Sequence, residues 1–529
     1  MRQNGGASNL KFYNLEQGIG WAAVLLRLVL LFLGFVGAMG CSVEKDPRTV
    51  VMVIESSPLN LDPRIGTDAQ SERIGSLIFD SLLRRDESSN LHPWLAERWE
   101  VADPLTYIFY LRKDVRFHDG KPLTAQDVVY TFESLLSGQT KSLKSSSFNY
   151  LESIQARDDF TVVFRLKEAR ASFLWNMTQG AIGIVPNGAT DELAVKPIGT
   201  GPFRFVSAAL DEHVILERNN NAWGEKARIE KVEFKVVPDA TTRALEIRKG
   251  AADIALNSLT ADMVESLRKE PNLKVYQEPG ISYQYIAFNL ESPKLPVAVR
   301  QAIAYGIDRE PLIRYLWQNS VQPASSILPA QHWAYSSDTQ SYSHDPEKAK
   351  GILDRAGFTP GLDGVRLRLQ MKTSTDQTGR ELAAVLQEQL RLIGIELDIR
   401  SFEFATFYAD IVRGSFEMYS LRWAAGNDDP DIFDYAFHST KIPPSGANRG
   451  RYKNVEVDRL IEEARSSSDQ TLRKANYARV QQILNEELPY IHLWYMDNVC
   501  VYSSRLSNLH LFPTGNYEFL TEVELNKAN

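Results

Sequence analysis

The sequence of 529 residues contains very little cysteine: only Cys41 and Cys500 occur. Two cysteines cannot provide a disulfide framework for a chain of this length, so the fold must rely on hydrophobic cores. Hydrophobic residues make up 43% and charged residues 24% of the chain, values typical of folded globular domains. The length corresponds to about three such domains, and the composition excludes a disordered chain and a many-pass membrane protein.

Runs of basic residues are also absent. The net charge is −8 at pH 7, and the Lys and Arg residues are scattered along the chain. Nucleic acid is therefore not an expected partner, because a polyanion requires clustered positive charge.

The sequence shows no recognisable catalytic or metal-binding pattern. None of its eight histidines lies three to five residues from another, so paired metal ligands are missing. The glycine-rich run at residues 199–201 is followed by Pro202, which has no N–H, so a phosphate loop is not predicted. A nucleophile elbow of the G-x-S-x-G type is also missing. We therefore expect no enzyme activity, no cofactor and no bound metal.

The N-terminal segment is unlike the rest of the chain. Residues 1–20 are mainly polar, and residues 19–38 are apolar apart from Arg27. This order is typical of an export signal, and the uninterrupted apolar run at residues 28–38 is shorter than the roughly 20 residues needed to span a bilayer. We expect residues 1–40 to form a signal peptide. The alternative, an uncleaved anchor, would place Arg27 in the bilayer at a cost of roughly 2.5–3.5 kcal/mol.

Small residues precede Cys41, in the order Ala38-Met39-Gly40-Cys41. This order resembles a bacterial lipobox, although Ala38 and Met39 stand where the motif usually has Leu and a small residue. The resemblance implies that Cys41 is lipidated, becomes the mature N-terminus and anchors the protein to a membrane through a tether at residues 41–47. The alternative is an incidental thiol after an ordinary signal.

The rest of the chain alternates predicted strands and helices, which indicates an α/β fold. A β-branched run at residues 49–56 predicts a strand, and an apolar stripe over residues 71–83 predicts a helix. Thr67 and Asp68 lie just before that helix, as candidates either for its N-terminal cap or for contacts with a ligand. Further strands are expected at residues 106–111, 365–371, 395–402 and 493–502, and helices at residues 347–356, 380–393 and 473–487.

Four segments of the chain resemble one protein family. The run VRFHDGKPLTAQDVVYTFESLL at residues 115–136 resembles the signature of the bacterial peptide- and nickel-binding extracellular solute-binding proteins, partners of ABC importers. In this run His118 and Asp119 fit a turn, and Thr124 and Asp127 have the spacing of a capping box. Residues 197–203, 289–313 and 452–464 resemble further segments of the family, in similar order and spacing.

The resemblance implies a periplasmic-binding-protein-like type II fold, with two lobes, a hinge and an additional small domain. Two segments, residues 280–289 and 491–502, would cross between the lobes. The implied function is capture of a peptide or peptide-like solute outside the cytoplasmic membrane, and delivery to an ABC transporter permease, by a monomer. We expect lobe I to comprise residues 48–63, 197–283 and 498–529, an inserted domain residues 64–196, and lobe II residues 284–497.

Three alternatives to this function differ from it in the ligand or in the functional class. A non-peptide solute, such as a sugar or a metal chelate, could bind to the same fold. A sensory or chaperone lipoprotein could use the fold to present its ligand to another membrane partner. A lipoprotein hydrolase would need a nucleophile or a metal constellation, which the sequence does not show.

The candidate binding site is the stretch of residues 416–439. Its first half alternates like a buried strand, and a loop of small and acidic residues follows from Ala424. Trp423 offers an apolar face with one N–H, while Asn427 and Asp428 offer polar groups to a ligand. The alternative is an Asp/Pro turn with solvated carboxylates beside a core tryptophan.

One position departs from the family. In peptide-binding members an Asp three residues after this tryptophan pairs with the free α-amino group of the ligand, but Gly426 stands there in this chain. Since a buried ammonium without a partner is costly, either Asp428 reaches the same space or the ligand presents no free amine. Tyr285 and Tyr495, on the two crossings, are expected either to line the cleft or to belong to the hinge core.

We predict that Cys41 carries the lipid and is the sole membrane attachment. One acyl chain binds a membrane only marginally, so stable anchoring requires several chains on this cysteine. Mass spectrometry of the mature N-terminus should show an acylated Cys41, and a Cys41→Ala protein should leave the membrane fraction. An unmodified Cys41, or a Cys41→Ala protein that stays with membranes after signal cleavage, would contradict the prediction.

Overall fold

The computed structural model describes residues 46–178, 182–423, 430–467 and 469–526. The expected signal peptide, Cys41 and the loop with Asn427 and Asp428 lie outside these residues. Arg48–Asn529 forms one compact unit. Within the described residues, no helix combines the length and the apolar character needed to cross a membrane.

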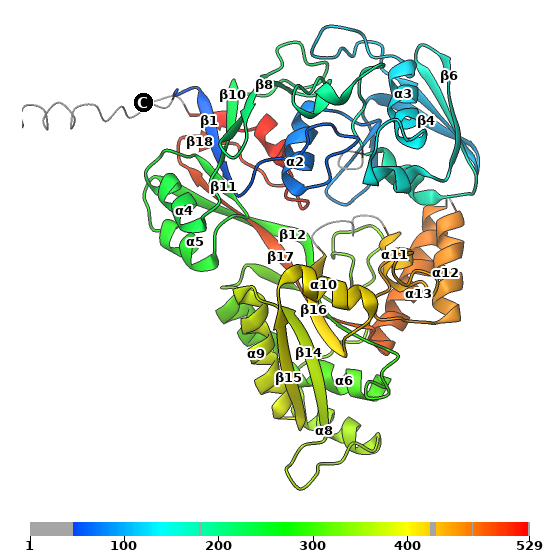
Figure 1. Cartoon of the computed structure of the whole chain (residues 1–529), viewed down its shortest axis with the longest axis vertical. Helices are drawn as coiled ribbons and strands as arrows, with labels where there is room; N and C mark the ends of the chain where they lie inside the picture. The colour runs from blue at the N-terminus through cyan, green and yellow to red at the C-terminus, as the bar shows by residue number, and fades with distance from the viewer. Residues whose placement is uncertain (1–45, 179–181, 424–429, 468, 527–529) are drawn as a thin grey trace, which may run out of the picture. The chain divides into compact units, whose positions relative to one another are not determined.

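A long mixed sheet runs through both expected lobes. Two of its strands, β12 (Leu273–Phe288) and β17 (Tyr490–Ser503), pair antiparallel along nearly their whole length. These strands contain the two expected crossings, so the lobes are joined by one paired ribbon and not by two separate connections (Figure 1). The strand order is β15 (Ile395–Phe402), β14 (Leu367–Ser374), β16 (Met418–Trp423), β12, β17, β11 (Ile254–Leu256), β1 (Thr49–Ile54), β10 (Lys231–Val236), β9 (His213–Arg218) and β8 (Phe203–Ala209), with β13 (Val321–Pro323) beside β17.

The β12–β17 ribbon loses its regular register between Pro279 and Ser282. There the N–H of Ile281 donates to the carbonyl of Pro513, outside the ribbon, at 3.1 Å. Irregularities of this kind bend and twist a strand locally. The β12–β17 ribbon is therefore bent where it runs from one lobe to the other.

On the lobe I side, β1 is the parallel partner of both β10 and β11. All of its residues are buried, which confirms the strand expected from the β-branched run. Alternate side chains of β1 pack against α2 (Ala69–Ile78) on one face of the sheet and against α4 (Ala240–Arg248) and α5 (Ala261–Leu267) on the other.

A separate antiparallel sheet lies within the expected inserted domain. Helix α3 (Ala125–Leu136) packs on it through Phe132, whose ring lies 5.2 Å from that of Phe164. The predicted capping box of α3 is confirmed, because the N–H of Thr124 donates to Asp127 at 2.7 Å. The strand order is β4 (Ala96–Asp103), β5 (Thr106–Leu111), β7 (Thr161–Leu166) and β6 (Leu151–Asp158).

His118 has the structural role that the sequence predicts. Its ring accepts the N–H of Gly199 at 3.3 Å and lies 3.1 Å from the carbonyl of Gly201, which fastens the turn to the glycine-rich segment. Burial lowers the pKa of His118, so the ring is neutral at pH 7.

In lobe II, β14 pairs in parallel with β15 and β16, while β16 pairs antiparallel with β12. The mixed sheet and the expected helices are confirmed, with shifted ends, but the short α11 was not expected within an acidic stretch. One face carries α6 (Val297–Gly306), α8 (Pro346–Arg355) and α9 (Gln377–Arg391), and the other carries α10 (Phe404–Arg413), α11 (Ile432–Phe437), α12 (Val455–Ser466) and α13 (Gln470–Glu487).

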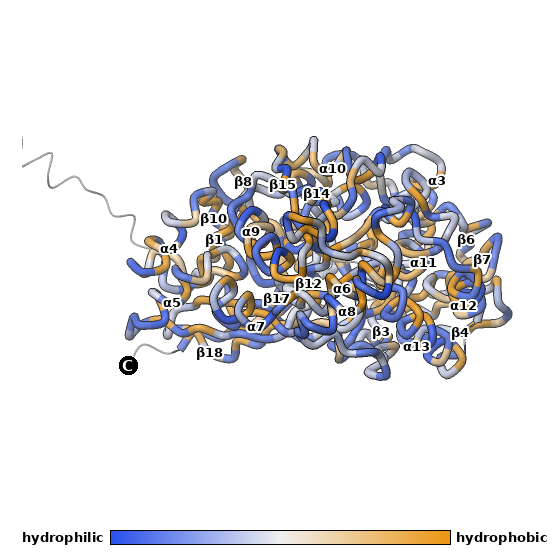
Figure 2. The backbone as a smooth tube through the Cα atoms, turned by 90° about the horizontal axis from the view of Figure 1, so that it is seen from below, coloured by the Kyte–Doolittle hydropathy of each residue, from blue (hydrophilic) through white to orange (hydrophobic). Residues whose placement is uncertain are grey.

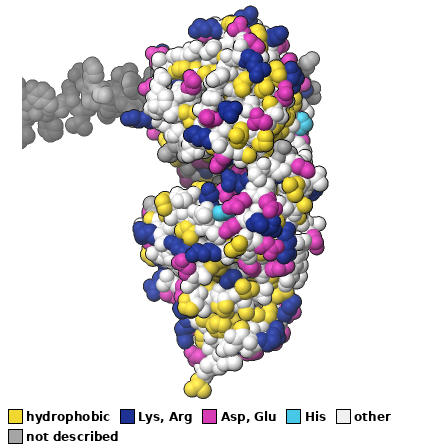
Figure 3. Space-filling view, turned by 90° about the vertical axis from the view of Figure 1, so that its right-hand side faces the viewer, with side chains coloured by type: hydrophobic (Ala, Val, Ile, Leu, Met, Phe, Trp, Pro, Cys, Tyr) yellow, Lys and Arg dark blue, Asp and Glu magenta, His cyan; other side chains and the backbone are white. Residues whose placement is uncertain are grey.

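Hydropathy and charge follow this arrangement. In Figure 2, hydrophobic segments run mostly through the interior and hydrophilic segments lie mostly at the periphery. On the face shown in Figure 3, Lys and Arg side chains are interspersed with Asp and Glu.

The helix expected at residues 71–83 is shorter than predicted. Helix α2 ends at Ile78, and β2 (Leu83–Arg85) begins five residues later. The N–H of Gly201 donates to the carbonyl of Ile78 at 2.9 Å, so the glycine-rich segment occupies the acceptor that another helical turn would use. A Cβ at Gly199 would lie 2.0 Å from the same oxygen, so this close approach requires glycine.

We predict that Gly199→Ala lowers the free energy of unfolding by about 1–3 kcal/mol, because the added methyl group collides with backbone. Gly75→Ala, within α2, is the matched control, since a Cβ there meets nothing within 4 Å. Alanine favours a helix over glycine by about 1 kcal/mol, so this control should be neutral or stabilising. Urea unfolding of both variants measures the difference, and equal stabilities would refute the close-approach argument.

Candidate functional site

Trp423 ends β16, where this strand lies against the β12–β17 ribbon. Its indole ring stacks on the ring of Tyr285, with centres 6.4 Å apart, and meets that of Tyr435 edge-on at 6.2 Å. Ser282 of β12 donates a long hydrogen bond, 3.4 Å, to the carbonyl of Trp423. The predicted site tryptophan is therefore held against the crossing strand and not on a free loop.

Arg449 lies against this tryptophan. Its guanidinium carbon is 5.0 Å from the ring centre of Trp423 and 5.3 Å from that of Tyr408. The guanidinium donates hydrogen bonds to the hydroxyl groups of Tyr285, at 3.3 Å, and Tyr408, at 3.0 Å. Arg449 is only 7% exposed, and no carboxylate in the described part of the chain forms an ion pair with it.

Further buried tyrosines surround Tyr285, next to Trp423 and Arg449. Tyr285 stacks on Tyr490 with ring centres 4.2 Å apart, and meets Tyr419 edge-on at 6.1 Å. Burial raises the pKa of all three hydroxyls and outweighs the opposite effect of the positive Arg449. The tyrosines are therefore neutral donors at pH 7. We call the set of Trp423, Tyr285, Tyr408, Tyr419, Tyr490 and Arg449 the Trp423 wall.

The other predicted site residues have structural contacts. Tyr495 is buried and donates to the carbonyl of Ser326 at 2.5 Å, which supports the hinge-core alternative. Asp68 accepts the N–H of Ser71 at 2.9 Å and so caps α2, the structural one of its two expected roles. Thr67 is exposed, and Asn427 and Asp428 lie outside the described residues.

Arg449 and Tyr408 were not among the residues predicted from the sequence. Two residues further along, Arg451 forms an ordinary ion pair with Glu291 at 3.2 Å. Nothing in the local sequence distinguishes the two arginines. The difference arises only when the fold brings the end of β16, α10 and residues 448–452 together.

A second aromatic cluster joins the inserted domain to lobe II. The rings of Trp175 and Trp333 stack with centres 6.1 Å apart, and the guanidinium of Arg473 lies 4.8 and 5.1 Å from them. Arg473 is 2% exposed, and two of its nitrogen atoms find no acceptor in the described residues. We call these three side chains the interlobe clamp, because the contact requires the two parts to lie together.

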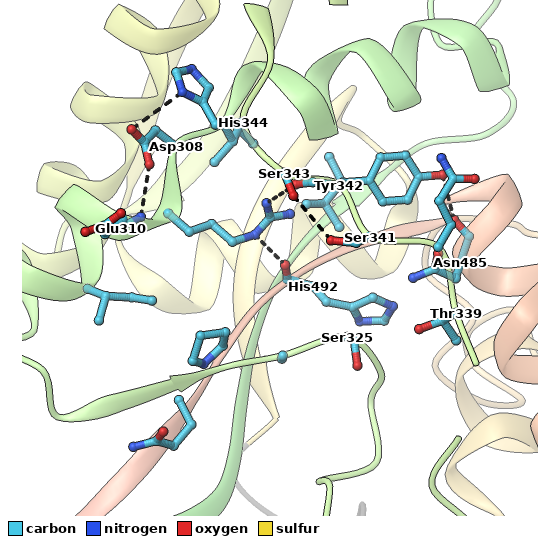
Figure 4. A pocket seen from close by; sticks show the side chains of 18 of the residues that line it. Asp308, Glu310, Ser325, Thr339, Ser341, Tyr342, Ser343, His344, Asn485 and His492 are labelled. Carbon is cyan, nitrogen blue, oxygen red and sulfur yellow. Dashed lines mark hydrogen bonds and ion pairs between the residues drawn. The ribbon is translucent and has the colours of Figure 1, made fainter. Parts of the chain in front are cut away.

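A cavity of about 870 Å³ lies in lobe II, away from the Trp423 wall. In Figure 4, Asp308 and His344 of this cavity lie next to each other and form an ion pair. Asp308 lies 3.5 Å from His344, and Arg309 donates to the carbonyls of His492 and Tyr342 at 3.0 and 3.1 Å. Burial, helped by Arg309, lowers the pKa of His492 to about 3, so this ring is neutral. Because these charged groups already have partners within the protein, this cavity is a weaker candidate for a binding site than the Trp423 wall.

Within the described residues, no group of three His, Cys, Asp or Glu side chains is arranged to hold a metal ion.

Comparison with known proteins connects this geometry with one family. Residues 90–443, more than half of the chain, match the model of the bacterial extracellular solute-binding proteins, family 5, middle part. The di/tripeptide-binding protein 2 of Pseudomonas aeruginosa is 30% identical over 500 residues, which cover 88% of this chain and 93% of that protein.

Two solved structures are also similar. The oligopeptide-binding protein AppA from Bacillus subtilis, in complex with a nonapeptide, is 27% identical with a TM-score of 0.73, and the match covers 90% of this chain and 99% of AppA. NikZ from Campylobacter jejuni, in complex with Ni(L-His), is 26% identical with a TM-score of 0.75, and the match covers 90% of this chain and 99% of NikZ.

We predict that Arg473→Gln shifts the protein towards a more open arrangement of its lobes. The variant loses a desolvated cation–π contact of about 0.5–2 kcal/mol that links the inserted domain to lobe II, so the two parts should separate more readily. Solution scattering should show a larger radius of gyration. Arg479→Gln is the control, because this arginine of the same helix is exposed and pairs with Glu456 at 3.1 Å. If both variants scatter alike, the clamp does not hold the lobes together.

Proposed function

Since this chain belongs to the bacterial extracellular solute-binding proteins, family 5, we propose that it captures a peptide or peptide-like solute between its lobes and delivers it to an ABC transporter permease. The observation that carries the proposal is the Trp423 wall, which places aromatic faces and one positive charge beside the ribbon that joins the lobes. Support for a peptide comes from a relative named for di- and tripeptides and from the nonapeptide bound to AppA.

Capture depends on closure in this proposal. A solute that touches both lobes favours the closed state only to the extent that its contacts there exceed those in the open state. The interlobe clamp adds an attraction that does not depend on the solute. The bend at Pro279 and Ser282 provides the place where the lobes rotate.

The setting of the protein is also part of the proposal. We place it on the outer side of the cytoplasmic membrane, in the periplasm or at the cell surface, with lipidated Cys41 as the anchor and the monomer as the working form. The family consists of substrate-binding proteins, and this supports a protein that binds and releases its solute unchanged.

A metal chelate is the second candidate solute. The observation that favours it is the similarity to NikZ, whose structure holds Ni(L-His). A chelate and a peptide share carboxylate and amine groups, so the same wall could serve either ligand.

Loading of the purified protein distinguishes the two solutes. Denatured and refolded protein would be mixed with a tryptic digest of casein or with Ni(L-His), and bound molecules would be identified by native mass spectrometry. We expect peptides to be retained from the digest. Retention of Ni(L-His) alone would replace the peptide by a chelate, and retention of neither would overturn the proposed function.

We propose that Asp428 binds the free amine of the solute. It would replace the Asp that peptide-binding members have at the position of Gly426. Asp428→Asn should weaken binding of free-amine peptides by roughly 2–5 kcal/mol, as expected when one partner of a buried charge pair is removed. N-acetylated versions of the same peptides should lose little. Calorimetry of both proteins with matched peptides tests this, and equal losses for the two peptide sets would remove Asp428 from the amine site.

A further inference from the structure

We propose that the cavity of about 870 Å³ in lobe II is a second binding site, which takes a small neutral molecule rich in hydroxyl groups, such as a sugar. The inference goes beyond the proposed function, because it concerns a molecule other than the captured solute. The described residues that line the cavity belong to segments 307–344 and 485–492, within the range expected for lobe II. A molecule bound there contacts one lobe only, so its binding does not depend on closure.

The size and the apolar surface of the cavity suit such a molecule. Binding sites for small molecules in proteins typically enclose about 300–1,000 Å³, and this cavity lies within that range. Ile313, Pro323 and Leu488 contribute apolar surface to its lining. The C–H groups of a sugar ring can pack against these side chains, while its hydroxyl groups face the polar part of the lining.

The charged side chains at one end of the cavity already have partners. Asp308 accepts the N–H of Glu310 at 3.1 Å, and the carboxylate of Glu310 accepts from Arg314 at 2.7 Å. Arg309 donates to two backbone carbonyls, at 3.0 and 3.1 Å. Together these two acidic and two basic side chains carry no net charge. An ion that entered the cavity would lose water without gaining a net counter-charge, so the arrangement favours a neutral molecule.

The other end of the cavity carries neutral polar groups. In Figure 4, Thr339, Asn485 and His492 lie on one side of the cavity, and the charged Asp308 and Glu310 lie on the other. Hydroxyl and amide groups both donate and accept hydrogen bonds. The hydroxyl groups of a sugar do the same, so the two sets can pair in either direction.

His492 contributes a neutral donor to this end. Burial raises the pKa of Tyr283, so its hydroxyl keeps its proton and donates to Nδ1 of His492. The ring proton of His492 is then on Nε2. Burial, helped by Arg309, lowers the pKa of His492 to about 3, so the ring brings an N–H donor and no charge at pH 7.

Further groups in the lining favour a ligand with several hydroxyls. Ser325, Ser341 and Ser343 add three hydroxyl groups. The Oδ1 atom of Asn485 is buried and has no hydrogen-bond partner among the described residues. An unpaired buried acceptor costs free energy, and an O–H group of a bound molecule would offset this cost.

The cavity and the Trp423 wall are separate sites on the same ribbon. His492, in the cavity lining, contacts Tyr283, whose ring stacks on that of Tyr285 with centres 5.5 Å apart. Tyr285 belongs to the wall, and both tyrosines are buried, so these rings lie between the two sites. A molecule in the cavity therefore does not take the place of the captured solute.

Sugar binding by the full-length mature protein tests the proposal. The probes are D-glucose and maltose, with gluconate and glucosamine as charged analogues. Saturation-transfer NMR detects binding, and calorimetry measures the Kd. We expect a neutral sugar to bind and both charged analogues to bind at least about tenfold more weakly, because their charge would be buried beside groups that are already paired. Binding of neither neutral sugar, or tighter binding of a charged analogue, would overturn the inference.

Variants locate the bound sugar. Thr339→Trp places an indole ring in the cavity and should abolish sugar binding. Thr241→Trp is the matched control, because Thr241 is an exposed residue of α4 in lobe I; it should bind the sugar like wild type. If Thr339→Trp does not fold by circular dichroism, Ser343→Trp replaces it, since Ser343 is an exposed residue of the lining. Wild-type affinity in a folded variant of either lining residue would overturn the site.

Competition separates this inference from the proposed function. An excess of peptides from a tryptic digest of casein should leave the Kd for the sugar unchanged. Displacement of the sugar by these peptides would place it between the lobes and would overturn the second site, while peptide capture would stand. A protein that binds the sugar in the cavity but retains no casein peptide would overturn the proposed function alone.

Discussion

The antiparallel pairing of β12 with β17 is the interaction on which the rest of the structure depends. The two strands contribute side chains to cores in both lobes: Cys500 and Val501 face opposite sides of the lobe I sheet, and Ile286 and Tyr285 face opposite sides of the lobe II sheet. Strand β12 also pairs with β16, in a register that sets Trp423 opposite Tyr283. The candidate-site tryptophan is therefore positioned by one of the two strands that join the lobes.

The chemistry of the Trp423 wall follows from where its charge is buried. In water an arginine is satisfied by solvent, but at 7% exposure Arg449 depends on what the protein places around it. The surroundings are aromatic rings, which tolerate a cation on their faces, and hydroxyls, which orient it. Among the described residues, this combination orients the guanidinium through two hydroxyls and two ring faces.

The sequence predicted much of the fold because the fold depends on periodic patterns and local caps. The β-branched run of β1, the apolar stripes of α8, α9 and α13, and the capping box at Thr124 are local features, and all appear in the structure. The predicted end of α2 was wrong because the carbonyl of Ile78 accepts the N–H of Gly201, a residue far away in the sequence. Local patterns carry no information about such a competitor.

The site was predicted less completely for the same reason. Trp423 stands at the end of a strand with a clear pattern, and β16 does end at this residue. Tyr285 was placed on a crossing, but its contact with Arg449 joins residues more than 160 positions apart. Arg449 carries no local mark that sets it apart from Arg451. Its burial and its contacts with Trp423 and Tyr285 are visible only in the assembled structure.

The irregular register between Pro279 and Ser282 has a consequence for how fast a solute leaves. Because the regular ladder is already interrupted there, we expect the lobes to separate by flexing the ribbon at this point, without breaking the paired segments on either side. Opening would then require Trp175 to separate from Trp333 around Arg473, in addition to the loss of the solute's own contacts. The residence time of a bound solute would therefore depend partly on an aromatic contact between the two parts of the protein.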